Sequence, residues 1–581
     1  MLDPMLPFQT MSRPENLRFN RWEVADPARF EESETLSHRH PILLQVLYNR
    51  GLTRSADISA FLNKQYQLNR DPFLLADMDK AIDRIRRAIE EDEMIVVYGD
   101  FDADGVTSTV LLTEALRRLG LQKRQVVPYI PDRVDEGYGL NEEALRGIRK
   151  KGASLVISVD CGIRSLNEVR LAKEIGLDMI ITDHHNLGSD LPPAEAVINP
   201  RRPDSSYPEK RLAGVGIAYK LAQALRGSFP DRASFEAEEL LDLVALGTVA
   251  DLAPLLGENR VLVAGGLEVL NHSRRPGIDA LIDVSGLSSG SITSESIAFG
   301  LGPRINAAGR LSHAYDAARL LTVKNQQQAR QYANDLNRLN RERQQITAQL
   351  YEKAVGLIDE EDTVLVAADE EFLSGVVGLV ASRLADRFYR PAIVLEKGEE
   401  ESRGSCRSIP GFHITEALDA NADLLERHGG HAQAAGFTIR NENLDEFRVR
   451  INEYASSILD EEKLTPSIAI DAEADLADVD WALHGVLADL EPTGSENALP
   501  ILMSRNAKVL SHRAVGQDSA HLQLSVGDDQ QRLGCIAFRQ GAWENRLPET
   551  IDLVYTVGVN EWNDRRSLQL VVKDIREASS E

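Results

Sequence analysis

Short apolar runs alternate with longer amphipathic segments between residues 94 and 199. Runs of this length, bounded by turn residues, are typical of buried strands, and the segments between them have the spacing of helices. Strands and helices that alternate in this way imply right-handed crossovers, so we predict an α/β fold with a doubly wound parallel sheet. The predicted strands are MIVVY, QVVPYI, SLVISV, DMIIT and AVIN.

The pattern changes three times after this sheet. Helical spacing dominates residues 212–321, and residues 325–350 predict one long polar helix, which we interpret as a connector between domains. A second α/β pattern follows, in which TVLVAAD and PAIVLE are strands on either side of the helical GVVGLVASRLADRF. After an acidic stretch, the alternating runs HLQLSV, RLGCIAF, DLVYTVGV and SLQLVVKDI predict a small β-barrel.

The chain of 581 residues exceeds what one hydrophobic core supports, so these patterns are read as several domains. We expect an N-terminal region at 1–71, of mixed pattern but helical character over residues 16–71. The further domains are the first α/β domain with a helical layer at 72–324, the connecting helix at 325–350, the second α/β domain at 351–456, and an acidic linker with a barrel like the oligonucleotide-binding (OB) fold at 457–581.

Cysteine usage and hydropathy restrict the class of protein. The three cysteines, Cys161, Cys406 and Cys535, form no CxxC pair, which argues against a disulfide framework and a cysteine zinc site. No window approaches the roughly 20 apolar residues of a membrane helix, and the first residues lack a basic segment followed by an apolar one. We therefore expect a cytoplasmic protein with reduced thiols and no membrane partner.

The formal net charge of −26 would ordinarily argue against a polyanionic partner, because Lys and Arg supply most non-specific affinity for nucleic acid. The charge is unevenly distributed, however. Residues 460–496 carry eleven acids and one lysine, whereas residues 300–350 carry eight bases and three acids. The local electrostatic potential near the basic residues matters more for binding than the net charge of the whole chain, so nucleic acid remains a candidate partner.

Three of the predicted strands end in acidic motifs, which are GDFDADG, VDCG and DHH. The carboxyl ends of parallel strands meet at one edge of a sheet, so the side chains in these motifs should converge. The residues concerned are Asp100, Asp102, Asp104, Asp160, Asp183, His184 and His185. So much negative charge in one place requires cations.

The first motif also fits the start of an EF-hand calcium loop, which needs a Glu at its twelfth position. Counting from Asp100, that position is Leu111, and a strand rather than a helix precedes the motif. We therefore favour a turn that binds a hard cation, followed by a helix capped by Thr107 or Ser108. The alternative for a lone DxD motif is a solvated acidic turn without a ligand. This alternative is less consistent with the sequence because two other strands also end in acidic motifs.

The adjacent histidines His184 and His185 cannot both face the core of the sheet. Carboxylate and neutral imidazole together suit Mn²⁺, Fe²⁺, Co²⁺ or Zn²⁺, and Mg²⁺ where oxygen ligands dominate. Asp251 in LGTVADLAPL offers a further carboxylate, although an acid between an apolar helix and Pro254 is equally consistent with a helix cap.

In this order and spacing, GDFDADG, VDCG, DHH and GTVADLAPL resemble the four motifs of the DHH phosphoesterase superfamily. SRGSCRSIPGFH and RHGGHAQAAGF resemble the associated DHHA1 domain. With PDRVDEGYGLN, GLGPRINAAGRL and the terminal barrel, the chain resembles the RecJ family of single-strand-specific DNA exonucleases over most of its length. One position departs, because many members have His where this chain has Tyr98, and Asp100 is the candidate replacement.

The resemblance implies two divalent cations, Mn²⁺ or Mg²⁺, and assigns their ligands. Asp160 would bridge both ions. Asp102 with Asp100 would hold one ion, and Asp104, His184 and Asp251 would hold the other. Asp183 would orient His184 from outside the ligand set, and His185 would donate to the scissile phosphate or the leaving oxygen.

Binding of the strand requires further cations. Arg304, Asn306 and Arg310 are candidates for the scissile and neighbouring phosphates, with pairing to nearby acids as the structural alternative. The Gly, Ser and Arg alternation around residue 405 predicts a nest of backbone amides for an anion, with a ligand-free glycine turn as the alternative. The candidates for the 5′-terminal phosphate or the next ones are Arg133, Arg403, Ser405, Arg407, Gly430 and His431.

Other residues could guide a strand toward the site. Arg338, Arg341 and Arg343 lie on the predicted connector. Phe538, Tyr555 and Trp562 lie in the predicted barrel, where aromatic side chains stack bases in some proteins but more often fill the core.

The activity that the resemblance implies is 5′→3′ hydrolysis of single-stranded DNA to 5′-mononucleotides in repair and recombination. A monomer at the nucleoid is expected, and the resemblance implies a single-stranded-DNA-binding protein and a helicase as partners. No GxxxxGK[ST] motif is present, so ATP-driven unwinding should come from another protein. The alternatives are a phosphoesterase for short oligonucleotides or cyclic dinucleotides, and a non-catalytic DNA-binding replication scaffold. The scaffold would have lost carboxylates that this chain retains.

Overall fold

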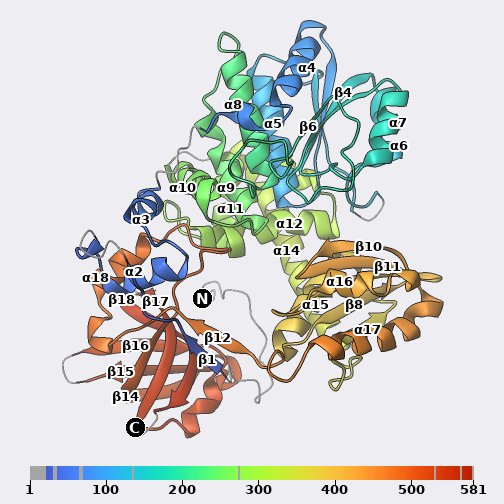
Figure 1. The fold of residues 1–581 in the computed structure, drawn as a ribbon. Coiled ribbons are helices and arrows are strands. Elements are labelled where there is room, and N and C mark those ends of the chain that lie inside the picture. Colours follow the sequence, from blue (N-terminus) through green and yellow to red (C-terminus); the bar gives the residue numbers. More distant parts are fainter. Residues whose placement is uncertain are drawn as a thin grey trace. The chain divides into compact units, whose positions relative to one another are not determined.

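The structure is a computed structural model that describes residues 21–30, 36–64, 70–133, 136–272, 275–528, 531–562 and 565–578. The chain forms two compact units. The first contains residues 64–349 and 492–497, and the second contains the other described residues (Figure 1).

A five-stranded sheet forms the centre of the first unit. Its strands are all parallel and follow the order β3-β2-β4-β5-β6, which confirms the predicted doubly wound α/β fold. The strands are β2 Met94–Tyr98, β3 Val126–Tyr129, β4 Ala153–Val159, β5 Asp178–Thr182 and β6 Ala196–Ile198.

Helices cover both faces of this sheet (Figure 1). Alternate side chains of β2 point to opposite faces, so Ile95 and Val97 pack with α4, α5 and α8, whereas Val96 and Tyr98 pack with α6 and α7. The helices are α4 Met78–Glu90, α5 Ala103–Arg118, α6 Glu142–Lys150, α7 Leu166–Glu174 and α8 Gly214–Ser228.

A helical layer and a connector complete the first unit. The long polar helix predicted at 325–350 is confirmed as α14, whose thirty residues run from Gln326 to Val355. The layer consists of α9 Leu241–Ala250, α10 Gly257–His272, α11 Pro276–Ser285, the π-helical η3 Ser296–Leu301, α12 Gly302–Leu311 and α13 Tyr315–Thr322, and short 3₁₀ turns occur at Pro72–Leu74 and Ala237–Leu240.

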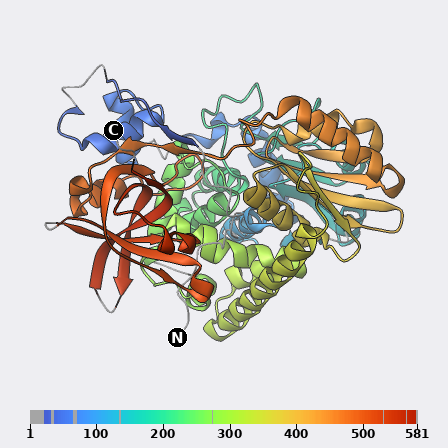
Figure 2. The same ribbon diagram turned by 90° about the horizontal axis from the view of Figure 1, so that it is seen from below.

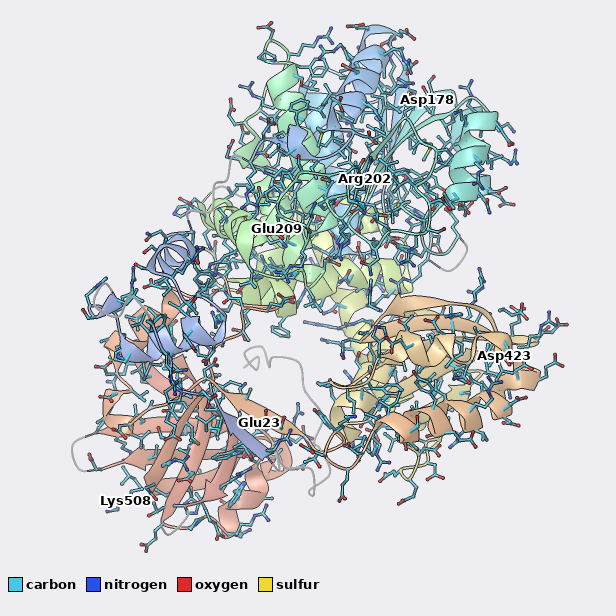
Figure 3. All side chains as sticks on the ribbon, in the orientation of Figure 1. Glu23, Asp178, Arg202, Glu209, Asp423 and Lys508 are labelled. Atoms are coloured by element: carbon cyan, nitrogen blue, oxygen red, sulfur yellow. The ribbon has the colours of Figure 1, made fainter. Side chains whose placement is uncertain are left out.

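The amino-terminal edge of the parallel sheet is held by ion pairs. Asp178, at the start of β5 (Figure 3), accepts hydrogen bonds from Arg84 at 2.6 Å and Arg87 at 3.1 Å. The Arg84 side chain is buried and also pairs with Glu93 at 2.7 Å. Asp178 and Glu93 therefore both have an arginine partner at this edge.

The second unit contains a five-stranded mixed sheet of order β10-β11-β9-β8-β7. The predicted strands TVLVAAD and PAIVLE and the helix between them are confirmed as β7 Leu365–Asp369, β8 Ala392–Lys397 and α15 Ser374–Phe388. The remaining elements were not predicted, and they are β9 Glu401–Arg407, α16 Ile414–Asp419, β10 Leu425–His431, β11 Ala434–Arg440 and α17 Leu444–Ile458, with 3₁₀ turns at Ala422–Leu424 and Asn441–Asn443.

The predicted amide nest around residue 405 is wrong. Strand β9 lies between β8 and β11 and pairs with both in antiparallel register, so its backbone amides are committed to the sheet. Gly404 is needed for packing, because a Cβ there would lie 2.5 Å from the ring of Phe437.

Five strands close the predicted barrel, because β14 pairs with β15 at one end and with β17 at the other (Figures 1 and 2). The four predicted runs correspond to β15 His521–Gly527, β16 Arg532–Ala537, β17 Thr550–Trp562 and β18 Arg565–Glu577. The sequence did not predict the longest strand, β14 Leu502–Val515.

The acidic stretch is structured. It contains β12 Ser467–Ile470, β13 Ala472–Glu473 and α18 Trp481–Ala488, with a 3₁₀ turn at Leu476–Asp478. Two further 3₁₀ turns, Gln517–Ser519 and Gly541–Asn545, lie between strands of the barrel. The N-terminal β1 Arg21–Val24 pairs in parallel with β12, and α2 Pro41–Asn49 and α3 Ser55–Leu62 follow it. The described part of the N-terminal region thus contains two helices, in line with its predicted helical character.

Candidate metal centre

The turn after β2 places the first three carboxylates at the start of α5. Asp102 is the N-cap of this helix, and its Oδ1 accepts a hydrogen bond from the Gly105 amide at 3.0 Å. The prediction that Thr107 or Ser108 caps the helix is therefore wrong, because the helix already begins at Ala103 and the Asp102 carboxylate accepts from an amide of its first turn. Gly105 allows the close turn, since a Cβ there would lie 2.6 Å from the backbone of Asp100.

Asp104 lies against the first turn of α8. Its two carboxylate oxygens accept hydrogen bonds from the amides of Gly214 at 2.7 Å and Val215 at 2.8 Å. The amides at a helix start are favourable partners for a carboxylate. Asp104 therefore joins the helical layer to the edge of the sheet.

Asp160 follows β4 with a φ of +62°, a left-handed backbone conformation that residues other than glycine rarely adopt. Its buried Oδ1 lies 3.1 Å from Nε2 of His184, and the same His184 atom lies 4.0 Å from Oδ2 of Asp251. Gly214 makes room for this carboxylate, since a Cβ there would lie 2.6 Å from Asp160 Oδ1.

The predicted acids and histidines do converge. Each of three groups offers ligand atoms that lie within 4.8 Å of one another. The groups are Asp100 with Asp102 and Asp160, Asp104 with His184 and Asp251, and Asp160 with His184 and His185. Asp251 is the C-cap of α9, so its backbone ends a helix while its side chain joins the cluster.

The expectation that Asp183 orients His184 is wrong. Oδ1 of Asp183 accepts from the backbone amide of His185 at 3.0 Å and contacts Nδ1 of the His185 ring at 2.7 Å. Oδ2 accepts from the amide of Ile163 at 2.9 Å. The chain turns after β5 so that Asp183 holds His185, while the ring of His184 faces Asp160.

Burial sets the charge state of this cluster in the absence of cations. Burial, and then the charge of Asp102, hold the pKa of Asp100 well above its usual range and raise that of Asp104 to about 7. Burial and the charge of Asp104 likewise raise the pKa of Asp160. Burial alone would raise the pKa of Asp183, but its hydrogen bond to His185 lowers it.

The residues present fit divalent cations. Oδ1 of Asp100 is buried and has no hydrogen-bond partner among the described residues, an arrangement that is unfavourable unless a ligand satisfies it. The possible ligands in the cluster are carboxylates and the imidazole nitrogens of His184 and His185, which match Mn²⁺, and Mg²⁺ where carboxylates dominate. Tyr98 does not offer a ligand, because its hydroxyl donates to the Gly139 carbonyl at 3.0 Å and its ring stacks on Tyr129.

Arg133 lies next to the cluster. Its guanidinium lies 4.1 Å from the centre of the Phe101 ring. Burial lowers the pKa of Arg133, and the charges of Asp100 and Asp102 oppose this effect. Asn306 contributes to the same region, but its Oδ1 accepts from the Ala103 amide at 2.8 Å, so only its amide nitrogen remains for a phosphate.

Arg304 and Arg310 both lie on α12. Arg304 donates to Asn337 at 3.1 Å and to the Gly300 carbonyl at 2.7 Å. Burial, and then the charge of Arg341, lower the pKa of Arg304 to about 10. Two guanidinium groups near each other are a suitable place for a phosphate. Of the other predicted connector residues, Arg343 is buried, whereas the Arg338 side chain is mostly exposed.

The remaining predicted phosphate ligands lie in the second unit. Arg407 donates to the Ser405 hydroxyl at 3.2 Å, and both lie against α15, where a Cβ on Gly378 would lie 2.9 Å from Arg407. Arg403 is exposed on β9. Gly430 and His431 end β10, and Gly430 has a φ of +149°.

Sequence reasoning missed two aromatic residues. The Tyr138 hydroxyl lies 3.3 Å from Nδ1 of His185, and only its place in the motif PDRVDEGYGLN could have indicated it. Trp481, 48% exposed, lines a hollow of about 480 Å³ on β15, β16, β17 and β18. Among the predicted barrel aromatics, Tyr555 is buried with its hydroxyl 2.7 Å from that of Ser504, Phe538 is 38% exposed, and the Trp562 side chain lies outside the described residues.

Three family models match the chain in the expected order. The model described as the DHH family, N-terminal domain, matches residues 94–248. The DHHA1 domain matches residues 361–457, and the RecJ OB domain matches residues 470–574, which cover the barrel. The OB-like nature of the barrel is thereby confirmed.

Named relatives match most of the chain. The single-stranded-DNA-specific exonuclease RecJ of Bacillus subtilis is 39% identical over 563 residues, which are 95% of this chain and 70% of the relative. The Escherichia coli protein of the same name is 34% identical over 94% of this chain and 97% of its own length. The crystal structure of Thermus thermophilus RecJ in complex with Mn²⁺ has a TM-score of 0.83 and 30% identity, and the match covers 96% of this chain and 80% of that one. The chain therefore belongs to the RecJ family of single-stranded-DNA-specific exonucleases.

Proposed function

We propose that this protein is a divalent-cation-dependent exonuclease that degrades single-stranded DNA from the 5′ end to 5′-mononucleotides, in DNA repair and recombination. The observation that carries the proposal is the convergence of five carboxylates and two histidines at the carboxyl edge of the sheet. Membership in the family supports the substrate, because the relatives are named for single-stranded DNA.

Asp100, Asp102 and Asp160 would hold one cation, and Asp104, His184 and Asp251 would hold the other, with Asp160 shared. Two bound divalent cations supply Lewis-acid stabilisation of the in-line displacement at a phosphodiester and activate water at neutral pH. Mn²⁺ and Mg²⁺ are the preferred ions, since Thermus thermophilus RecJ has been solved in complex with each. Asp100 takes the place of the histidine that many members carry at the position of Tyr98.

His185 would donate a hydrogen bond to the scissile phosphate or to the leaving O3′. Burial alone would lower the pKa of His185, but the hydrogen bond and charge of Asp183 raise it above the ordinary value of histidine. With Nδ1 held by Asp183 at 2.7 Å, Nε2 is the atom that remains to donate. Cleavage of the P–O3′ bond then releases a 5′-mononucleotide and leaves a new 5′-phosphate on the strand.

Arg304, Arg310 and the amide nitrogen of Asn306 would hold the phosphates next to the cut. Arg133 lies near Asp100 and would neutralise a phosphate that approaches the cluster. In the second unit, Arg403, Ser405, Arg407, Gly430 and His431 are proposed for the 5′-terminal phosphate or the next ones. Side chains would have to bind it there, because the β9 amides are engaged in the sheet.

The cellular context is also part of the proposal. No helix among the described residues is long and apolar enough to cross a membrane. We place the protein in the cytoplasm at the nucleoid, as a monomer that works with a single-stranded-DNA-binding protein and a helicase. The family resemblance supports these partners, and copurification would test them.

Replacement of Asp160 by Ala tests the proposed mechanism. Asp160 belongs to two of the three ligand groups, so its loss should strongly reduce nucleotide release. The reduction should exceed the 10- to 100-fold that is typical when a residue hydrogen-bonded to a metal ligand is replaced. The assay is release from 5′-end-labelled single strands with Mn²⁺, with Asp178→Ala as a control at the opposite edge of the sheet. Undiminished release by the Asp160 variant would reject the mechanism.

A further inference from the structure

The C-terminal end of α9 adopts a Schellman motif, the hydrogen-bonded turn that commonly ends helices. The amide of Leu252 donates to the Val249 carbonyl at 3.2 Å, and the amide of Ala253 donates to the Thr248 carbonyl at 3.2 Å. In this motif the residue after the C-cap must have a left-handed backbone conformation. Here that residue is Leu252, which follows the C-cap Asp251 and has a φ of +60°. Glycine is the usual residue there because any Cβ is disfavoured.

Packing in the structure does not account for leucine at this position. The Leu252 side chain is 69% exposed, the largest exposure given for a large apolar side chain of the described residues. Among described residues with positive φ, Leu252 is the only aliphatic one. An exposed leucine in an unfavourable backbone conformation indicates a constraint other than folding.

The position of this leucine relative to the proposed chemistry suggests what the constraint is. Leu252 directly follows Asp251, whose Oδ2 lies 4.0 Å from Nε2 of His184. The π-helical η3 also contacts α9, and its Phe299 is 43% exposed. Where η3 continues into α12, a Cβ on Gly302 would lie 3.2 Å from that of Ala250, and Arg304 follows two residues later (α9 and α12 are labelled in Figure 1).

We propose that Leu252 is a specificity-determining residue that packs against the exposed face of an unpaired nucleobase beside the cleaved phosphodiester. This inference rests on the proposed function and adds which feature of the substrate is recognised, namely the exposed face of an unpaired base. In a duplex, both faces of a base are covered by its neighbours in the stack, whereas a single strand can place a base face against an apolar side chain. Arg304 would meet the phosphate, and Leu252 would meet the base.

The test compares four proteins on two substrates. The proteins are the wild type, Leu252→Gly, Leu252→Asn and the apolar control Leu252→Met. Asn tolerates the left-handed conformation but is polar, and Gly favours that conformation and has no side chain. One substrate is a 5′-phosphorylated single strand, and the other carries abasic sites at its first three nucleotides, so that its backbone charge is unchanged.

The wild type and Leu252→Met should cleave the intact strand with a kcat/KM about fivefold above that for the abasic strand, as expected for one apolar contact to a base. For Leu252→Gly and Leu252→Asn this ratio should fall toward one. Leu252→Gly should also raise the Tm by about 2 °C, because the backbone is relaxed. Its Mn²⁺ affinity, measured by calorimetry, should equal that of the wild type because no ligand is changed.

Two results would overturn the inference. One is an unchanged preference for the intact strand in Leu252→Gly and Leu252→Asn. The other is a Tm that falls by several degrees in Leu252→Gly, because the leucine would then serve packing within the protein. A wild type that releases no nucleotide from either strand would instead overturn the proposed function and this inference with it.

Discussion

Asp100, Asp104 and Asp160 are buried carboxylates whose pKa values lie above the ordinary range because of burial first, and then because of a neighbouring charge, that of Asp102 for Asp100 and Asp104 and that of Asp104 for Asp160. In the metal-free protein they hold protons that the unfolded chain has already lost. The free energy of unfolding should therefore fall as the pH rises from about 4, the ordinary pKa of Asp, toward and beyond about 7, the pKa of Asp104. Bound cations reverse this trend because they pair with the ionised form.

Removal of the metal should consequently matter more at high pH. We expect the difference in Tm between Mn²⁺-loaded and EDTA-treated protein to be small at pH 5 and to grow through pH 8. Differential scanning calorimetry at constant ionic strength measures it. As a matched control, Asp160→Asn removes one charge, so without metal it should be more stable than the wild type at pH 8 and gain less from Mn²⁺. A Tm difference that does not change with pH would contradict this account.

The contact between α8 and the sheet edge depends on the absence of a side chain at one position. Gly214 begins α8, donates to Asp104, and approaches Asp160 so closely that a Cβ would lie 2.6 Å from its carboxylate oxygen. Gly214→Ala should therefore displace Asp160 and reduce Mn²⁺ affinity at least tenfold, with a lower Tm.

Gly216→Ala is the matched control for this helix. The added Cβ would lie 3.5 Å from the Leu212 side chain, which is ordinary van der Waals contact. Alanine also favours the helix more than glycine does. This variant should keep its Mn²⁺ affinity and have a Tm equal to or above that of the wild type, as measured by titration calorimetry and thermal unfolding. Equal effects of the two substitutions would mean that helix propensity, and not the approach to Asp160, determines the result.

The whole molecule is strongly acidic, with a net charge of −26, so its affinity for DNA must come from local basic surface. One such surface is a groove of α14 lined by Asn334, Asn337, Arg338, Arg341, Glu342 and Gln345. Arg341→Gln should weaken binding of single strands regardless of sequence and lower the slope of log Kd against log salt by about 1.

Fluorescence anisotropy from 50 to 300 mM salt measures that slope. Arg330→Gln is the control, because Arg330 is exposed on the same helix but does not line the groove. The control removes the same charge, so it should leave the slope nearly unchanged. If both substitutions change the slope equally, the strand responds to net charge and not to the groove.

The sequence by itself determined the elements in which apolar side chains mark a buried face. The strands of the parallel sheet, the connector α14 and four of the five barrel strands follow from such patterns, and motif spacing identified the acids that converge. Strand β9 was missed because its inward positions hold Ser402, Gly404 and Cys406 in place of large apolar residues. The predicted division at residues 72, 325, 351 and 457 stays a prediction.

Only the tertiary structure decided how neighbouring residues share their roles. The sequence placed Asp183, His184 and His185 together, but the direction of the turn after β5 decides that Asp183 holds His185 and that His184 faces Asp160. The structure likewise shows that Asp102 caps α5, and that Leu252 is exposed and has a left-handed backbone conformation. These facts depend on the exact backbone path of each turn and, for His184 and Asp160, on the meeting of two strand ends, whereas periodicity reports only which face of an element is buried.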